Sequence, residues 1–329
     1  MYDRYYNFSG LPFQLTPDSR FFFGSSGHSR AIAHLVYGLA QEEGFIVVTG
    51  EVGAGKTTLV EQLWSQLDRQ SYVMARVVTT RVSGDDLLRL VVTNFGVPDD
   101  GGAGKATLLR RFESMAHEQR AAGRRCLLVV DEVQNLPLAA LEELRMLSNI
   151  TVDGRASVQT ILLGQPQFRA TLGHPDAEQL RQRVLASYHL GPLTEAETRS
   201  YVEHRLKRVG WSDDPRLEAA AFAFVYRYTD GIPRRINTLC SRALMYGAIE
   251  ESHVITGPMV ETTANELSQD LGAGLPAPQP AVALMPASGV PEPSGDALVR
   301  RIEALEQTCA RQDRVFRRLM DLLSAMAER

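Results

Sequence analysis

The chain has 329 residues, of which 44% are hydrophobic and 22% charged, and its formal net charge at pH 7 is −4. This composition is ordinary for a soluble globular protein, and the small negative charge excludes a chain built throughout to bind polyanions. Its three cysteines lie far apart in sequence, which predicts neither a disulfide framework nor a zinc site. With no leader and no run of about 18 apolar residues, we expect a cytoplasmic protein that reaches the inner membrane only through a partner.

Residues 1–24 form an aromatic arm with little helical periodicity. The arm holds eight of the 12 phenylalanines and 10 tyrosines of the chain. We expect these rings to pack on the body as a hydrophobic strap. The alternative is that part of the arm walls an adenine pocket or a subunit contact.

Strands and helices alternate over residues 25–192. The expected strands are the apolar runs at 45–49, 72–78, 126–130, 158–163 and 186–190. The expected helices lie at 28–40, 57–67, 83–94, 107–122 and 138–148. This order predicts an α/β fold with a parallel five-stranded sheet that is covered by helices on both faces.

Beyond Pro192 the pattern becomes purely helical and predicts a small helical lid domain over 193–271. Thr194 and Glu197 have the spacing of a capping box that opens a helix to residue 209. Further helices are expected at 215–229, 233–249 and 258–271.

Two different patterns follow the helical domain. Six of the 16 prolines fall in residues 272–295, which predicts an extended linker. Over 296–329 apolar residues recur with heptad spacing. This predicts a helix that self-associates as a coiled coil, with docking on a partner or on the body as the alternative.

The most informative motif joins the first expected strand to the next helix. Gly50–Thr57 reads G-x-x-x-x-G-K-T and directly follows the buried strand at 45–49. Such glycines let backbone N–H groups surround phosphate oxygens, and the helix directs its positive dipole end at the anion. Lys56 is expected to reach the β- and γ-phosphates, and Thr57 to bind Mg²⁺. The predicted nucleotide-binding residues are Gly50, Glu51, Val52, Gly53, Ala54, Gly55, Lys56, Thr57 and Thr58.

A second motif places two carboxylates at the end of the third expected strand. The apolar run 127–130 leads directly into Asp131 and Glu132. Asp131 is predicted to hold the Mg²⁺ shell, and Glu132 to act as the general base that polarises the attacking water. The chain lacks the Asn-Lys-x-Asp motif that reads guanine, which favours ATP over GTP.

Four more residues are candidates for the same chemistry. Gln165 follows a strand and could touch the γ-phosphate or the water, although a loop glutamine is the alternative. Arg181 and Arg183 precede the last strand, where an arginine can reach into a neighbouring subunit's site as an arginine finger. Arg234 begins a helix of the second domain and could bind the γ-phosphate from that side. For each arginine, the alternative is an ordinary surface or helix-terminal residue.

These motifs resemble those of AAA+ ATPases, and more narrowly the secretion ATPases of the general secretion pathway A type. The resemblance covers about residues 1–270 and rests on the opening segment YNFSGLPFQLTPDSRFFFGSSGHSRAIAHLVYGLAQEEGFIVVTGEVGAGKTT, and on LLVVDEVQNL, LLGQPQF, LRQRVLASYHLGPLT and GIPRRINTLCSRAL. The opening segment is similar to the subgroup associated with exosortase (PEP-CTERM) loci. The resemblance implies Walker A at 50–58, Walker B at Asp131 and Glu132, sensor 1 at Gln165, sensor 2 at Arg234, and the finger at Arg181 or Arg183.

The resemblance implies an oligomeric Mg-ATP-hydrolysing protein, in a ring or filament, that acts on a protein partner in an envelope secretion or exopolysaccharide–exosortase system. A nucleotide-gated scaffold with slow turnover is the second hypothesis. The same ATPase type also resembles transposition regulators that assemble on DNA, which is the third. DNA binding would need a basic stripe, with Arg110, Arg111, Arg124 and Arg125 as candidates, and a solvated face is the favoured interpretation of these four.

Overall fold

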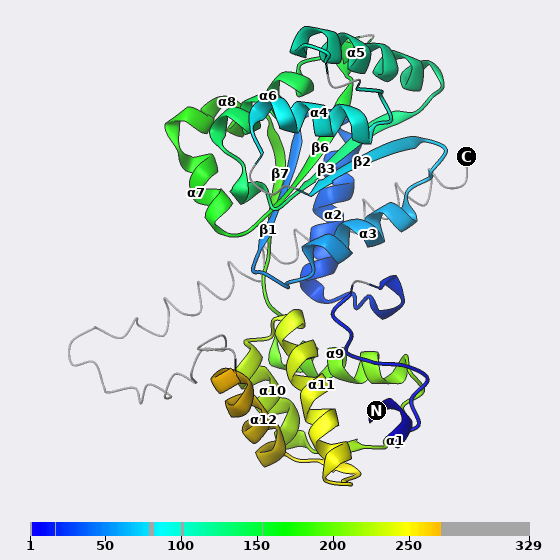
Figure 1. The fold of residues 1–329 in the computed structure, drawn as a ribbon, viewed down its shortest axis with the longest axis vertical. Coiled ribbons are helices and arrows are strands. Elements are labelled where there is room, and N and C mark those ends of the chain that lie inside the picture. Colours follow the sequence, from blue (N-terminus) through cyan, green and yellow to red (C-terminus); the bar gives the residue numbers. More distant parts are fainter. Residues whose placement is uncertain (1, 17, 79–81, 100–101, 153, 271–329) are drawn as a thin grey trace, which may run out of the picture. The chain divides into compact units, whose positions relative to one another are not determined.

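The computed structural model describes residues 2–16, 18–78, 82–99, 102–152 and 154–270, and it contains a five-stranded parallel sheet (Figure 1). The strands are β1 (Phe45–Gly50), β2 (Tyr72–Val78), β3 (Arg125–Asp131), β6 (Val158–Gly164) and β7 (Val184–Leu190). Their order is β2-β3-β6-β1-β7, and every neighbouring pair is parallel. The predicted parallel sheet is confirmed, and each predicted strand lies inside an observed one.

Helices cover both faces of this sheet. Successive side chains along a strand point to opposite faces, so Phe45 and Val47 belong to one apolar cluster and Ile46 and Val48 to another. The first cluster is completed mainly by α4 (Gly84–Asn94), α5 (Lys105–Ala121) and α6 (Leu138–Ser148). The second is completed by α2 (Ser26–Ala40) and α3 (Lys56–Gln66). Burial on both faces explains why the strands read as continuous apolar runs.

Short elements fill the connections of the α/β part, which is the sheet with its flanking helices. They are the hairpin β4 (Thr151–Val152) and β5 (Arg155–Ala156), and the helices α7 (Gln167–Gly173) and α8 (Glu178–Arg181). Some helix starts differ from the prediction by one or two residues. For example, α2 begins at Ser26 instead of residue 28, because the Ser25 hydroxyl caps it by accepting from the His28 N–H.

The helical part comprises α9 (Glu195–Lys207), α10 (Ala219–Thr229), α11 (Pro233–Ile249) and α12 (Gly257–Asp270). The predicted capping box of Thr194 and Glu197 is confirmed. The expectation of a purely helical pattern is wrong, since β8 (Arg216–Leu217) pairs in parallel with β9 (Val254–Ile255). Strands of two residues are too short to produce a periodic signal in the sequence.

The aromatic arm packs on the helical part. It contains α1 (Tyr2–Tyr5) and a short 3₁₀ turn, and five of its rings are buried with side chains of α9, α10 and α11. Arg205 of α9 fastens the middle of the arm, because its buried guanidinium donates to the carbonyls of Pro12 (2.6 Å) and Gln14 (3.4 Å). The same guanidinium lies 4.7 Å from the ring centre of Phe21. The arm is therefore bound by the helical part through its five buried rings and through the buried guanidinium of Arg205.

The predicted linker at 272–295 and heptad helix at 296–329 lie outside the described residues. Among the residues that are described, no helix is long and apolar enough to cross a membrane.

The turn between α10 and α11 yields a stability prediction. Gly231 has φ +68°, and a Cβ atom there would lie 2.0 Å from the Leu193 carbonyl oxygen, whereas Gly210, with φ +85°, has open space around it. We expect Gly231→Ala to lower the free energy of unfolding by ~2–5 kcal/mol, and Gly210→Ala by ~1–2 kcal/mol, because only the first adds a collision to the backbone strain. Urea titrations of both variants measure this, and equal losses would contradict the predicted collision.

Candidate active site

The predicted phosphate-binding loop connects the end of β1 to the start of α3. Gly53 and Gly55 have φ values of +82° and +99°, which favour glycine. A Cβ atom at Gly53 would lie 2.3 Å from the Arg234 Cβ, and one at Gly55 would lie 2.8 Å from the His28 Nε2. Both glycines are therefore required by conformation and by close neighbours, one from α11 and one from α2.

Lys56 lies inside this loop. Its side chain is buried, and its Nζ donates to the carbonyls of Gly50 (2.8 Å) and Glu51 (3.0 Å). Burial lowers the pKa of the Lys56 ammonium below the usual value, whereas the charges of Glu132, Asp131 and Glu51 act to raise it. Held this way, the ammonium is anchored to two carbonyls at the start of the loop.

The two predicted metal-binding side chains meet. The Thr57 hydroxyl, in the first turn of α3, donates to Asp131 Oδ2 over 2.8 Å, and Asp131 is buried at the end of β3. Mg²⁺ prefers oxygen ligands and is usually held by one or two protein groups together with phosphate oxygens. A hydroxyl and a carboxylate that converge beside a phosphate-binding loop fit that requirement.

Glu132 is held by two glutamine amides. Its backbone is in the left-handed region, with φ 54°. Its Oε2 accepts from the side-chain amides of Gln165, over 3.1 Å, and of Gln134. The backbone N–H of Gln165 donates in turn to Gln134 Oε1 over 2.9 Å, so that Gln134 is bound both to Glu132 and to Gln165. The predicted site residue Gln165 thus joins the predicted base directly.

Two residues of this site were missed by sequence reasoning. Gln134 lies in the 3₁₀ turn after Glu132, and only the fold of that turn brings its amide back to the carboxylate. Arg76 of β2 donates to Asp131 Oδ2 over 3.2 Å. The available signal for Arg76 was a charged residue within an otherwise valine-rich strand.

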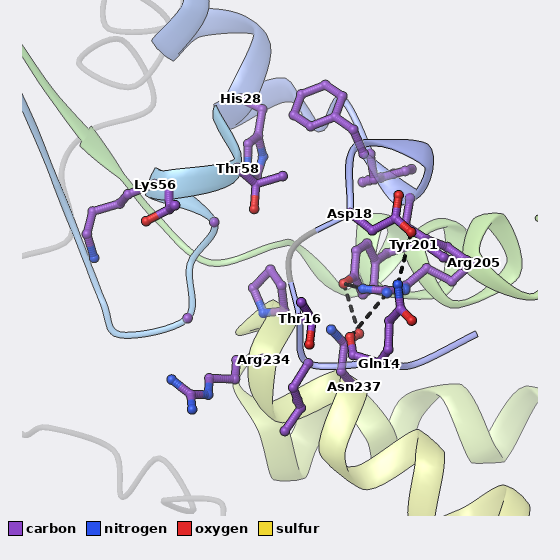
Figure 2. A pocket seen from close by; sticks show the side chains of 18 of the residues that line it. Gln14, Thr16, Asp18, His28, Lys56, Thr58, Tyr201, Arg205, Arg234 and Asn237 are labelled. Carbon is purple, nitrogen blue, oxygen red and sulfur yellow. Dashed lines mark hydrogen bonds between the residues drawn. The ribbon is translucent and has the colours of Figure 1, made fainter. Parts of the chain in front are cut away.

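A cavity of about 330 Å³ extends from the loop, and Figure 2 shows many of its side chains. The α/β part contributes His28, Lys56 and Thr58 to its lining, and the arm contributes Gln14 and Thr16. The helical part contributes Tyr201, Arg205, Arg234 and Asn237. Three of these are linked by hydrogen bonds. Arg205 donates to the Tyr201 hydroxyl over 2.8 Å, and that hydroxyl donates to Asn237 Oδ1 over 2.9 Å. Part of the arm therefore walls the cavity next to the phosphate-binding loop.

The three candidate arginines lie in different places. Arg234 lines the cavity, and its backbone N–H donates to the Gly53 carbonyl over 3.2 Å. Arg183 precedes β7, and its carbonyl accepts a hydrogen bond from the N–H of Phe45 at the start of β1. The loop follows the other end of β1, so Arg183 lies at the opposite edge of the sheet from the loop. Its guanidinium donates to the carbonyl (3.3 Å) and hydroxyl (3.2 Å) of Ser148, whereas that of Arg181 donates to the Leu172 carbonyl. The structure therefore brings Arg234 to this chain's own loop, and neither Arg181 nor Arg183.

Members of the candidate basic stripe have partners within the fold. Arg125 pairs with Glu42 over 3.1 Å, and its guanidinium lies 4.5 Å from the ring centre of Tyr72. Arg111 donates to the Pro98 carbonyl over 2.8 Å. These contacts fix two of the four arginines on the surface of the α/β part.

Solved structures show which class of fold this is. Cdc6p from Pyrobaculum aerophilum matches with a TM-score of 0.63 at 15% identity, over 83% of this chain and 74% of that chain. The ORC2 protein of Aeropyrum pernix matches with a TM-score of 0.58 at 18% identity, over 80% of this chain and 71% of that chain. The RuvB Holliday junction branch migration motor of Thermotoga maritima matches with a TM-score of 0.51 at 17% identity, over 77% of this chain and 72% of that chain. At such identities the likeness shows the fold alone, and that fold is the P-loop AAA+ fold.

Comparison of the sequence with known families and proteins gives a narrower description of the protein than the fold does. Residues 39–172 match the family model described as an AAA domain. General secretion pathway protein A of Aeromonas hydrophila is 36% identical over 268 residues, which are 82% of this chain and 49% of that protein. The chain is thus similar to general secretion pathway protein A, and it spans about half the length of that curated relative.

The buried histidine beside the loop predicts a pH dependence of stability. Burial lowers the pKa of His28 to about 4. The usual pKa of a histidine is about 6.5. As the pH falls below that value, the unfolded chain binds a proton at this residue, whereas the folded chain binds it only near pH 4. The free energy of unfolding therefore decreases by up to ~3 kcal/mol as the pH is lowered from about 6.5 to about 4. Urea titrations at several pH values should show this fall reduced in His28→Gln and kept in His34→Gln, which changes an exposed residue of the same helix. A profile for His28→Gln that superimposes on that of the unaltered chain would contradict the assignment.

Proposed function

We propose that this chain is a Mg²⁺-dependent ATPase that works as an oligomer in an envelope secretion system. The observation that carries the proposal is the junction of Thr57, Asp131 and Glu132. The hydroxyl and the first carboxylate meet over 2.8 Å, while the second carboxylate is clamped by two amides. Binding a phosphate needs the loop alone, whereas hydrolysis also needs a positioned base, which this junction supplies.

Each residue of the junction has a role in this reaction. The loop N–H groups and Lys56 bind the phosphates, and Thr57 and Asp131 would hold Mg²⁺. An ion held there would supply positive charge to the phosphate oxygens. Glu132 accepts a proton from the water that attacks the γ-phosphate, and the amides of Gln134 and Gln165 keep its carboxylate oriented for that transfer.

The helical part couples the nucleotide to a larger movement. Gly53 accepts a hydrogen bond from the N–H of Arg234, and Glu197 of the capping box accepts from the Ser26 N–H over 2.8 Å. Any displacement of the phosphate-binding loop therefore acts on α11, and any displacement of α2 acts on α9. We infer that ATP and ADP favour different positions of the helical part, which a partner protein detects.

The biological setting rests on similarity. The 36% identity to general secretion pathway protein A supports a role in secretion. The opening segment resembles the exosortase-associated subgroup, which supports an exopolysaccharide or protein-sorting system as the finer setting. The missing Asn-Lys-x-Asp motif supports ATP as the nucleotide. A slow, nucleotide-gated scaffold would have the same site and is distinguished from a motor by its turnover.

Two substitutions separate binding from hydrolysis. Lys56→Ala should weaken ATP binding at least ~100-fold, because it removes the positive charge that the proposal pairs with the phosphates, and titration calorimetry measures this. Glu132→Gln should bind ATP as before and lose ~10²–10⁴-fold in turnover, because only the base is removed. Unchanged ATP affinity in Lys56→Ala would place the site elsewhere. Equal turnover in Glu132→Gln and the unaltered chain, with ATP-dependent assembly retained, would support the scaffold.

A mixing experiment tests whether Arg183 acts on a neighbouring subunit. Glu132→Gln and Arg183→Ala should each be inactive alone, yet a 1:1 mixture should recover about one quarter of the activity, since about one interface in four pairs an intact base with an intact arginine. The same mixture with Arg181→Ala in place of Arg183→Ala tells the two arginines apart. Full activity of both single arginine variants would exclude a finger at these positions. Thermal melting of each variant confirms folding, because Arg183 also contacts Ser148.

A further inference from the structure

Arg76 lies where the sheet brings it to the metal-binding side chains. Strands β2 and β3 are parallel neighbours in which Arg76 is level with Val129 and Val78 with Asp131. Since side chains two residues apart share a face, Arg76 and Asp131 lie on the same face of the sheet. That face is the one covered by α2 and α3, because Val129 packs in the cluster that these helices complete.

The guanidinium of Arg76 is shared between two carboxylates. Its Nη2 donates to Asp131 Oδ2 over 3.2 Å, the same oxygen that accepts from the Thr57 hydroxyl. Its Nη1 donates to Glu61 Oε1 over 3.3 Å, one turn further along α3 than Thr57. The side chain of Asp131 is 6% exposed, whereas those of Arg76 and Glu61 are 34% and 38% exposed. The Arg76 contact is therefore better screened from water at Asp131 than at Glu61.

We propose that Arg76 competes with the divalent cation for Asp131, and that Glu61 moderates this competition by holding the guanidinium from the other side. The inference rests on the proposed function, since it concerns the metal of the same nucleotide site. Arg76 is thus a positioning residue that sets cation affinity.

The physical basis is charge. An arginine keeps its charge at all physiological pH values, so it can be moved or paired but not neutralised by losing a proton. While it pairs with Asp131 it offsets the negative charge that would attract the cation, and its own positive charge beside Asp131 would repel the cation. A guanidinium that moves towards Glu61 favours cation binding, because the negative charge of Asp131 is then less offset.

Mn²⁺ serves as the probe, and its binding to the full chain with ADP is followed by the electron paramagnetic resonance of free Mn²⁺. Arg76→Gln should tighten Mn²⁺ binding about tenfold, since a partly exposed positive charge beside Asp131 is removed. Glu61→Gln should weaken it about threefold, because the guanidinium then pairs with Asp131 alone. Changes of opposite sign from two neighbouring residues are not expected from a general loss of stability.

Arg89→Gln is the matched control. Its guanidinium is 33% exposed and pairs with Asp99 over 2.7 Å, away from the phosphate-binding loop. We expect its Mn²⁺ affinity to equal that of the unaltered chain. ADP binding in the presence of EDTA is measured for every variant by titration calorimetry, without reference to turnover.

Two results would overturn the proposal. If Arg76→Gln leaves the Mn²⁺ affinity unchanged, Arg76 does not act on the metal. If it weakens Mn²⁺ binding, Arg76 supports Asp131 and does not compete with the cation. In both cases ADP still binds in EDTA, which keeps the proposed function intact. Failure of ADP to bind the unaltered chain would instead defeat the proposed function itself.

Discussion

The hydrogen bond between Thr57 and Asp131 is the constraint on which the rest of the site depends. It joins the first turn of α3 to the end of β3, although β1, the strand that leads into α3, is separated from β3 by β6 in the sheet. The bond links two segments at the same edge of the sheet, where Lys56 follows β1 and Glu132 follows β3. The carboxyl ends of parallel strands meet there, which is where ligands bind in open α/β sheets.

The helical part and the arm belong to the same site because of two glycines and one buried arginine. Gly53 and Gly231 let backbones approach where any side chain would collide, with Arg234 in one case and Leu193 in the other. Arg205 holds the arm against α9 through two backbone carbonyls of the arm and the ring of Phe21. The cavity beside the phosphate-binding loop thus has a wall that is carried by the helical part, so a movement of that part would reshape the space around a nucleotide.

Local pattern was enough to predict most of the fold. Continuous apolar runs predict strands that are buried on both faces, and the structure has all five in one parallel sheet. Short pairings such as β8 with β9 escaped prediction, because two residues carry no periodicity. Gln134 and Arg76 escaped for another reason. Each acts through a contact that depends on a turn or on strand order, and a strand order is not written in any single segment.

The sequence by itself determined which residue types stand at Gly50–Thr57 and at Asp131 and Glu132, and their fixed local spacing predicts what that loop and that strand end bind. Tertiary structure alone decided that the arm packs on the helical part and that Arg183 lies at the edge of the sheet opposite this chain's own loop. It also decided that Asp131 is contacted by Arg76. The physical reason is that such contacts join residues distant in sequence, and their energy depends on distance and burial, which only the folded chain defines.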